Sequence, residues 1–306
     1  MKATTRAHLS VFVVNLIYAA NFSIAKLVMP EYVKPFAFIV LRVVPATILF
    51  FIISWMLPTE RVRKEDKYFM VLGALFGVAV NQLLFFKGLS LTSPINGALI
   101  MTTNPVLVLM MAAFFLKEHI SWNKILGIAL GIAGAFILIL LGSSFHIKGG
   151  NTEGDIYVFL NSVSFAYFIV MAKPLMLRYH PITNMKWIFF FGSLMVFPFG
   201  YPELKQVEWS AIPLKIWLCI AFVVFFVTFI AYLMNVFALK ELSPSQVSIY
   251  IYLQPVFATL ISMIIGEGKP GWLHLISAVM IFVGVYLVSR QKIEGVNRRK
   301  QNEQVE

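Results

Sequence analysis

Cysteine is almost absent from this chain, and charged side chains are scarce. With Cys219 as the one cysteine, an intrachain disulfide and a cysteine metal cluster are both excluded. This residue lies inside an apolar run, where a small buried hydrophobic side chain is expected. Charged residues make up 13% of the chain, whereas about 25% is typical of soluble domains. The composition therefore argues against a water-soluble protein.

Acidic residues are missing from the middle of every long apolar run. All 14 Asp and Glu residues lie between the runs, at their ends or in the polar tail. Proton-driven pumps usually carry a buried acid or histidine within a span. Since the acids of this chain lie outside the middle of the runs, the sequence offers no evident proton-coupling residue. Uniport and exchange therefore both stay open. Glu118 and Glu267 lie at run ends, where we expect them to pack loops and helix ends.

Sequence motifs of enzymes are absent as well. The chain has no H-E-x-x-H, G-x-S-x-G, P-loop or G-x-G-x-x-G motif, and no paired acids inside a run. No Ser/His/Asp set lies at a common depth in the runs. We therefore predict a protein that is not an enzyme and that binds no cofactor and no metal.

Apolar sequence, in contrast, is abundant. Hydrophobic residues make up 59% of the chain, and the mean hydropathy is +0.83. The excess is divided into runs of about 20 residues, the length that a helix needs to cross roughly 30 Å of hydrocarbon. The runs predict an all-α integral membrane protein in a lipid bilayer. Its ten transmembrane helices are expected at 8–29, 36–57, 68–88, 94–116, 122–143, 155–173, 185–200, 214–238, 244–265 and 272–289.

The first run also has features of a cleaved signal peptide, because basic residues precede it and a pair of alanines resembles a cleavage site. A later run repeats it, however. Asn15 corresponds to Asn161, and Lys26 corresponds to Lys173. A segment repeated within the chain is better explained as part of the architecture.

The two halves of the chain share a set of landmarks. Ser93-Pro94 recurs as Ser243-Pro244, at an offset of 150 positions (243 − 93). The same offset relates Asn104-Pro105 to Gln254-Pro255, Trp122 to Trp272, and Gly134 to Gly284. Several landmarks at one offset indicate an internal repeat. We place the two repeats at 1–146 and 147–289, followed by a polar cytoplasmic tail at 290–306.

Each half holds five predicted spans, so the second half must enter the membrane from the opposite side to the first. This predicts two inverted five-helix repeats, a design that many secondary transporters share. Most Lys and Arg residues lie near the two termini and in alternate connections. The other side holds Lys34, Lys87, Lys148, Lys205, Lys215 and Lys269. The positive-inside rule therefore predicts a multi-pass protein of the cell inner (plasma) membrane with both termini in the cytoplasm.

The net charge of +11 could also indicate a nucleic-acid partner. The basic residues lie between apolar runs rather than on one face, so no nucleic acid is expected. Two small-residue spacings, Gly73-xxx-Gly77 and Gly127-xxx-Gly131, allow helices to approach closely. We expect them to serve contacts within the bundle, and a homodimer through the fifth span stays possible.

The duplicated segments also carry a family resemblance. The first-half segments are Tyr18-Ala-Ala-Asn21-Phe22 through Lys26, Arg42, Ser93-Pro-Ile-Asn-Gly-Ala-Leu, Asn104-Pro-Val, Leu116-Lys-Glu118 and Gly127 through Gly134. Their counterparts are Ser243-Pro, Gln254-Pro-Val, Gly266-Glu267 and Gly284. With these motifs the chain resembles the drug/metabolite transporter superfamily with two EamA-type repeats, over about 8–289.

This resemblance implies a ten-helix inverted-repeat bundle that exports or exchanges small metabolites, often amino acids or related solutes. The chain departs from the family pattern at Tyr18-Ala19, where many relatives carry a Trp-Gly pair. The second repeat is also degenerate in its first two helices. The resemblance thus bears on fold and transport more than on the identity of the substrate.

Two prolines in the middle of spans predict the centre of the transport route. Pro105 and Pro255 each remove one backbone hydrogen bond and predict a kink. In a membrane a kink is tolerated where neighbours or a water-filled cavity satisfy the freed carbonyl. Each kink is either an ordinary packed bend or a flexible element that lines the route. Its occurrence at the same place in both halves favours the second interpretation.

Polar side chains in neighbouring spans either bond helices together or face a solute. Because they converge from several spans, we favour a central cavity that binds a small-molecule substrate. The candidate substrate-binding residues are Asn21, Lys26, Arg42, Asn81, Gln82, Asn96, Asn104, Tyr232, Asn235, Tyr250 and Gln254.

The in-membrane cations have two interpretations. Lys26 and Arg42 either extend to the nearby interface or serve function. Lys173, the counterpart of Lys26, is expected at the inner end of its span. Inversion would then place one cation in each vestibule, where it could attract a solute that carries a carboxylate.

These inferences together predict a secondary transporter, an exporter or exchanger of amino-acid-like or other small organic solutes that works by alternating access. A membrane scaffold or a channel is the alternative. A scaffold has no need of inverted halves or of paired kinks, and this favours the transporter.

Overall fold

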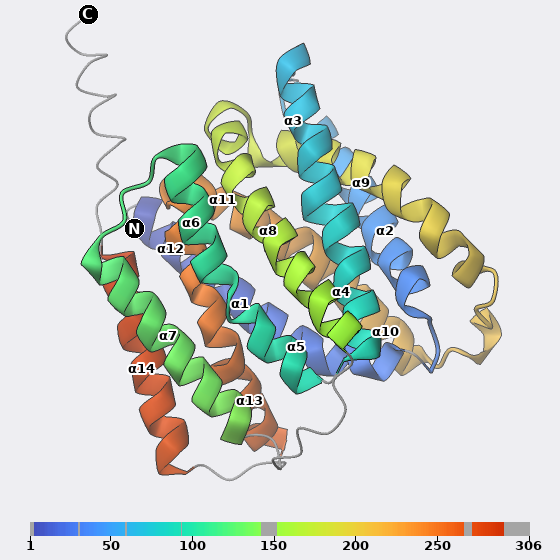
Figure 1. Cartoon of the computed structure of the whole chain (residues 1–306). Helices are drawn as coiled ribbons and strands as arrows, with labels where there is room; N and C mark the ends of the chain where they lie inside the picture. Colours follow the sequence, from blue (N-terminus) through green and yellow to red (C-terminus); the bar gives the residue numbers. More distant parts are fainter. Residues whose placement is uncertain are drawn as a thin grey trace, which may run out of the picture.

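The computed structural model describes residues 3–29, 31–58, 60–92, 94–141, 152–265 and 271–290, and within these ranges it contains helices and no β-strand. The α-helices are α1 (Ala3–Val28), α2 (Pro35–Trp55), α3 (Lys64–Ala74), α4 (Val80–Leu91), α5 (Pro94–Met101), α6 (Asn104–Leu116), α7 (Trp122–Leu141), α8 (Thr152–Arg178), α9 (Pro181–Leu204), α10 (Leu214–Phe222), α11 (Ala231–Glu241), α12 (Pro244–Ser248), α13 (Leu253–Ile265) and α14 (Trp272–Ser289). They form one helical bundle (Figure 1).

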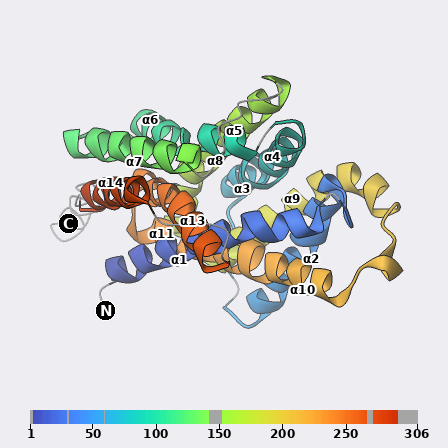
Figure 2. The same ribbon diagram turned by 90° about the horizontal axis from the view of Figure 1, so that it is seen from below.

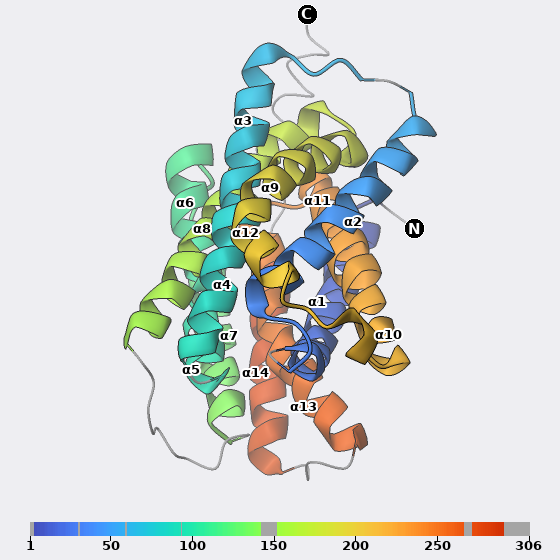
Figure 3. The ribbon, with the colours of Figure 1, turned by 90° about the vertical axis from the view of Figure 1, so that its right-hand side faces the viewer.

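Short segments of different helical pitch join several of these helices into longer rods. π-Helical segments at Leu75–Ala79 and Val223–Ile230 join α3 to α4 and α10 to α11. Figure 3 shows α3 and α4 as one continuous rod. The two π segments lie at equivalent places in the two halves. π-Helical segments are rare overall, and those that occur often lie at functional sites. The presence of one in the third helix of each half therefore makes these two helices candidates for a functional role.

Eight helical stretches among the described residues are long and apolar enough to cross a membrane. They are Pro35–Trp55, Lys64–Leu91, Gly97–Leu116, Trp122–Ile139, Thr152–Arg178, Pro181–Leu204, Leu214–Glu241 and Trp272–Ser289. Each overlaps a predicted span, which confirms the all-helical membrane fold. The predicted spans at 8–29 and 244–265 are also helical, but they are not among these eight. The count of ten transmembrane helices therefore stays a prediction.

The first and ninth predicted spans are helical where the structure describes them. α1 has 26 residues, and its sequence includes polar residues such as Asn15 and Asn21. In the span at 244–265, a 3-10 turn at Ile249–Tyr252 lies between α12 and α13. Both carry polar side chains that a lipid-facing helix would not need.

Helices of the two halves pack on each other in reciprocal pairs. α4 packs on α8, and its counterpart α11 packs on α1. α6 also packs on α8, and its counterpart α13 packs on α1. α2 packs on α9 and α7 packs on α14, so that each of these helices meets its own counterpart. Reciprocal pairing of this kind is the pattern that a two-fold relation between units produces.

Glycines allow the backbones of α7 and α14 to touch. A Cβ atom placed on Gly127 would lie 2.7 Å from the carbonyl oxygen of Gly284, and one on Gly134 would lie 2.7 Å from that of Ser277. Ser277 is the counterpart of Gly127 (277 − 127 = 150), and Gly284 is the counterpart of Gly134 (284 − 134 = 150). The contact is thus reciprocal at the level of single residues. Figure 2 shows the two helices side by side along their length.

The first and last helices meet at one end of the bundle, which we call the termini end. Near the start of α1, His8 Nδ1 lies 2.9 Å from the hydroxyl oxygen of Tyr250. At the end of α14, Ser289 Oγ lies 3.5 Å from the same hydroxyl. The described ends of the chain therefore lie on one side, as an even number of crossings requires. We call the other side the opposite end.

Polar contacts fix the helix ends on both sides. At the termini end, the buried Asp66 carboxylate accepts hydrogen bonds from Arg178 Nη1 at 2.6 Å and from the Tyr179 hydroxyl at 2.7 Å. At the opposite end, Glu203 Oε2 accepts hydrogen bonds from the backbone N–H groups of Phe36 and Ala37 at 2.8 and 3.0 Å. Glu203 thereby satisfies N–H groups at the start of α2 that have no partner within the helix.

The glycine contact leads to a stability prediction. Gly284→Ala places a methyl group 2.5 Å from the carbonyl oxygen of Gly127, so α7 and α14 must separate. We expect a loss of about 1–3 kcal/mol, typical of overpacking, and a lower midpoint of thermal unfolding in detergent. Gly97→Ala is the control, since its methyl group would lie 3.6 Å from Leu89 Cδ1, an ordinary contact. Equal midpoints for the two variants would contradict the close approach of the helices.

Candidate substrate cavity

A cavity of about 130 Å³ lies where helices of the two halves face each other. Its lining residues are Tyr18, Asn21, Arg42, Asn81, Gln82, Phe85, Met101, Asn104, Asn161, Phe165, Val227, Tyr232, Ile251 and Gln254. They come from both halves of the chain. Their side chains are a mixture of amides, aromatic rings and aliphatic groups with one guanidinium group, which is the composition expected of a small-molecule site.

Seven of the eleven predicted substrate-binding residues line this cavity. They are Asn21, Arg42, Asn81, Gln82, Asn104, Tyr232 and Gln254. Asn235 lies behind the lining, where its Nδ2 donates a hydrogen bond to the Tyr18 hydroxyl at 3.2 Å. The side chains of Lys26 and Asn96 lie outside the described residues. The part that any of these residues takes in binding stays a prediction.

Tyr250, another of the predicted residues, is not among the described residues that line this cavity. Its hydroxyl faces the termini end and contacts His8. The reason is the 3-10 turn at Ile249–Tyr252, which changes the direction of successive side chains before α13 begins. Ile251 therefore reaches the cavity in its place.

Sequence reasoning missed several of the lining residues. Tyr18 and Asn161 were recognisable, because Tyr18 lies in the family motif of the first run and Asn161 is the counterpart of Asn15. The apolar lining residues carry no such signal. Phe85 and Phe165 cannot be told from lipid-facing phenylalanines in a chain with 29 of them.

Two hydrogen bonds in the centre join residues to their own counterparts. Gln82 Nε2 donates to the Tyr232 hydroxyl at 2.8 Å, and these two residues are 150 positions apart. The Tyr252 hydroxyl donates to the carbonyl oxygen of Thr102 at 3.0 Å, again across 150 positions. A residue that contacts its own counterpart lies close to the axis that relates the two units. The cavity is therefore built around this axis.

The α-helix is interrupted just before each of the two prolines, where the sequence predicts kinks. α5 ends at Met101 and α6 begins at Asn104, with a turn between them. In the second half, the 3-10 turn at Ile249–Tyr252 precedes α13. Pro105 has no N–H to donate to the carbonyl group of Met101, four residues earlier, and Pro255 has none for Ile251. Met101 and Ile251 both line the cavity.

Arg42 brings the one guanidinium group to the described lining of the cavity. It is buried, with 5% of its surface exposed. Its Nε donates a hydrogen bond to Thr228 Oγ1 at 2.9 Å, and Thr228 Oγ1 in turn donates to the carbonyl oxygen of Val223 at 2.8 Å. The ring of Phe86 lies 6.0 Å from the guanidinium carbon. The side chain is thus held in place by Thr228, in the π-helical segment between α10 and α11, and by Phe86 in α4.

Lys173, expected at the inner end of its span as the second vestibule cation, is buried and hydrogen-bonded to backbone groups. Its Nζ donates hydrogen bonds to the carbonyl oxygens of Leu239, Lys240 and Leu242 at the end of α11. The last carbonyls of a helix have no partner within the helix and carry the negative end of its dipole. Lys173 therefore caps a helix and fixes α8 to α11.

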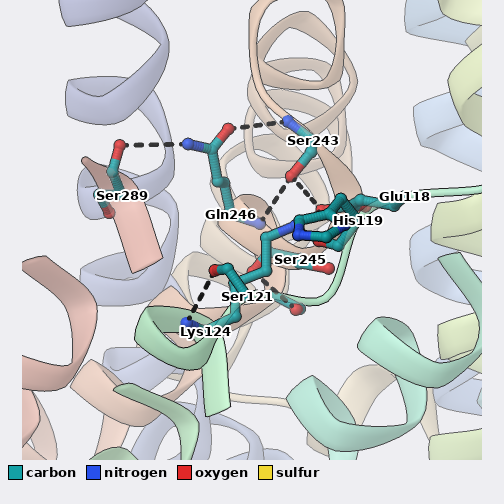
Figure 4. A network of polar contacts seen from close by, with 9 residues as sticks. Glu118, His119, Ser121, Lys124, Ser243, Ser245, Gln246 and Ser289 are labelled. Atoms are coloured by element: carbon teal, nitrogen blue, oxygen red, sulfur yellow. Dashed lines mark hydrogen bonds and ion pairs between the residues drawn. The ribbon is translucent and has the colours of Figure 1, made fainter. Parts of the chain in front are cut away.

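A polar network at the termini end connects the loop after α6 with α7, α12 and α14 (Figure 4). Glu118 Oε1 accepts hydrogen bonds from Ser243 Oγ at 2.7 Å and from Lys124 Nζ at 2.8 Å. Ser243 is also the N-cap of α12, and Gln246 Nε2 donates to the carbonyl oxygen of Ser289 at 3.1 Å. Glu118 thus packs a loop and a helix end, as its position in the sequence suggests. Glu267, its near counterpart, lies outside the described residues.

A bundle of apolar helices with a cavity of mixed polar and apolar lining between its two halves is the architecture of a multi-pass membrane protein that binds a solute. The model of the EamA-like transporter family matches residues 5–140 and again residues 152–290. The chain belongs to this family, which confirms the resemblance found in its motifs. The protein is thus a membrane transporter, and this family membership points away from an enzyme.

Known relatives agree with the family. An uncharacterized transporter of Bacillus subtilis, YyaM, is 31% identical over 231 residues, which is 75% of either chain. A probable terminal-alkyne amino-acid exporter of Streptantibioticus cattleyicolor is 23% identical and covers 82% of this chain and 83% of its own. A crystal structure at 19% identity has a TM-score of 0.74 and covers 93% of this chain and 98% of its own, which shows the shared fold.

The central hydrogen bond of Tyr252 can be tested by removing one atom. Tyr252→Phe leaves the carbonyl oxygen of Thr102 without its partner beside Pro105, which itself lacks an N–H. We expect the free energy of unfolding to fall by about 1–3 kcal/mol. Tyr286→Phe is the matched control, since Tyr286 is 54% exposed. Denaturant titration of both variants measures the difference, and a Tyr252→Phe variant as stable as the control would exclude the contribution.

Proposed function

We propose that this protein is a secondary transporter that moves a small organic solute by alternating access between two inverted five-helix repeats. The observation that carries this proposal is the position of the cavity on the axis between the halves. Gln82 and Tyr232, which are counterparts, bond to each other at its lining. A site on such an axis is reached from either side when the halves exchange their shapes.

The asymmetry of the two ends supports alternation. Tyr18 and Asn21 lie in the second half of α1, and Arg42 lies in the first half of α2, so these lining residues are nearer the opposite end. The network around Glu118 connects the loop after α6 with α12 at the termini end. We take this arrangement as one of two states, with the termini end shut. The charge distribution of the loops supports a cytoplasmic position for that end, with the protein in the plasma membrane.

The size of the cavity limits the solute. A cavity of about 150 Å³ in another protein binds benzene, so about 130 Å³ corresponds to a solute of roughly five to seven non-hydrogen atoms. Drug-sized ligands occupy about 300–1,000 Å³. Amino-acid-like solutes fit this range. The name of the amino-acid exporter among the relatives supports the same class and supports export or exchange.

The chemistry of the lining bears on energy coupling. The described lining residues include no Asp, Glu or His. A proton-coupled carrier needs a group that changes protonation in the route. This composition supports uniport or exchange, in which the solute gradient itself drives the movement.

Flux into reconstituted vesicles tests the function. We expect counterflow of a labelled small amino acid or organic acid to saturate with concentration and to require solute on both sides if exchange is the mechanism. A pore would instead give flux that rises in proportion to concentration. A scaffold would give no flux above that of protein-free vesicles. Either result would exclude the carrier.

Closure of the termini end can be locked chemically. Glu118→Cys and Ser243→Cys, in a Cys219→Ser background, place two thiols where side chains now bond at 2.7 Å. A short bifunctional thiol reagent should join them and lower exchange by about tenfold or more, because alternation requires this end to open. Reduction of a cleavable reagent should restore exchange. The single-cysteine variants treated in the same way are the controls, and undiminished flux after complete cross-linking would exclude a gate at this end.

A further inference from the structure

We propose that Arg42 binds the carboxylate of the transported solute, and that the substrates are therefore small organic carboxylates. This inference rests on the proposed transport function and adds the substrate class. It starts from the charge of the cavity. The ion pairs between described residues are Lys124–Glu118 and Arg178–Asp66, and Arg42 takes part in neither. Among the described lining residues no side chain carries a negative charge.

A buried cation without a counter-charge is costly in a membrane protein. The cost could be avoided if the side chain extended to the lipid interface, but Arg42 is 5% exposed and is enclosed by the bundle. Thr228 accepts a hydrogen bond from Nε alone. Within the described part of the chain, no partner accepts from the two Nη groups. A bound anion would supply both the missing charge and the missing acceptors.

The geometry of the guanidinium group favours a carboxylate. Thr228 fixes Nε from one side and Phe86 packs near the guanidinium carbon, so the remaining N–H groups form a fixed fork. Such a fork matches the two oxygens of a carboxylate. Tyr18 adds a donor in the same cavity, because its hydroxyl accepts from Asn235 Nδ2 and its own proton stays available. A compact cation such as lysine would not give this bidentate fit.

Unpaired acceptors elsewhere in the lining indicate a second group on the solute. The amide oxygens of Asn21 and Asn104 are buried and have no hydrogen-bond partner. Buried acceptors are nearly always satisfied, so a hydroxyl or amino group of the ligand is the expected donor. Together with a cavity of about 130 Å³, this points to small hydroxy- or amino-carboxylates.

Binding to the purified protein tests the carboxylate subsite. The probes are glycolate, lactate, alanine and serine, each compared with its own carboxamide, which has nearly the same size but lacks the negative charge. Ligand-induced shifts of the unfolding midpoint report affinity. We expect at least one acid to bind, and to bind about tenfold or more tightly than its amide. Failure of all acids to bind, or equal affinity for acid and amide, would overturn the inference.

Variants assign the preference to Arg42. Arg42→Gln should abolish the preference for acid over amide, and Arg42→Lys should keep part of it through the charge alone. Arg178→Gln is the matched control, since it removes a positive charge outside the cavity and should leave the preference unchanged. A preference that persists in Arg42→Gln would overturn the assignment. If Arg42→Gln does not yield folded protein, Arg42→Lys and the comparison of acid with amide on the unaltered protein still decide.

Vesicle flux separates this inference from the proposed function. Saturable flux of solutes without a carboxylate, unaffected in Arg42→Gln, would leave the transporter intact and remove the carboxylate subsite. Acid binding that depends on Arg42, in the absence of any flux, would support the carboxylate subsite and contradict the transport function. Flux of the same acids that bind, lost in Arg42→Gln and kept in Arg178→Gln, is the result expected if both hold.

Discussion

Contact between equivalent residues of the two halves is the constraint on which this structure depends. Gln82 meets Tyr232, Tyr252 meets Thr102, and the glycines of α7 and α14 meet across one interface. Each contact requires that the halves approach closely along a common axis. One of these pairs, Gln82 and Tyr232, also lines the cavity, as do Met101 and Ile251 next to the helix breaks.

The lipid environment explains why the broken helices are not simply unstable. A backbone polar group in hydrocarbon must find a partner within the protein. The carbonyl of Thr102 finds the Tyr252 hydroxyl, and the end of α11 finds Lys173. Polar side chains within the spans of this protein thus have two different roles. Some satisfy the backbone, and others remain unsatisfied around the cavity, where a solute can reach them.

The helical ranges were predictable because length and hydropathy decide them, and the repeat was visible in paired landmarks. The cavity was predictable in part. Amides such as Asn81 and Asn104 are costly in hydrocarbon without a hydrogen-bond partner, so they are expected to face the interior of the bundle. Local irregularity set the limits. A 3-10 turn directed Tyr250 away, and the sequence gives no sign of such a turn. The hydrogen bonds of Lys173 could not be predicted, because its acceptors are backbone atoms of a distant helix, which no side-chain pattern reveals.

The halves are related in shape but not in chemistry. Gln82 faces a tyrosine rather than a second glutamine, and Asn104 has Gln254 as its counterpart. A route built from two identical units would offer a solute the same groups on entry from either compartment. The route in this protein presents an arginine, amides and phenols, and a solute meets them in a different order when it enters from the other compartment. The dissociation constants on the two faces should therefore be unequal, so that half-saturation of flux comes at a lower concentration in one direction than in the other.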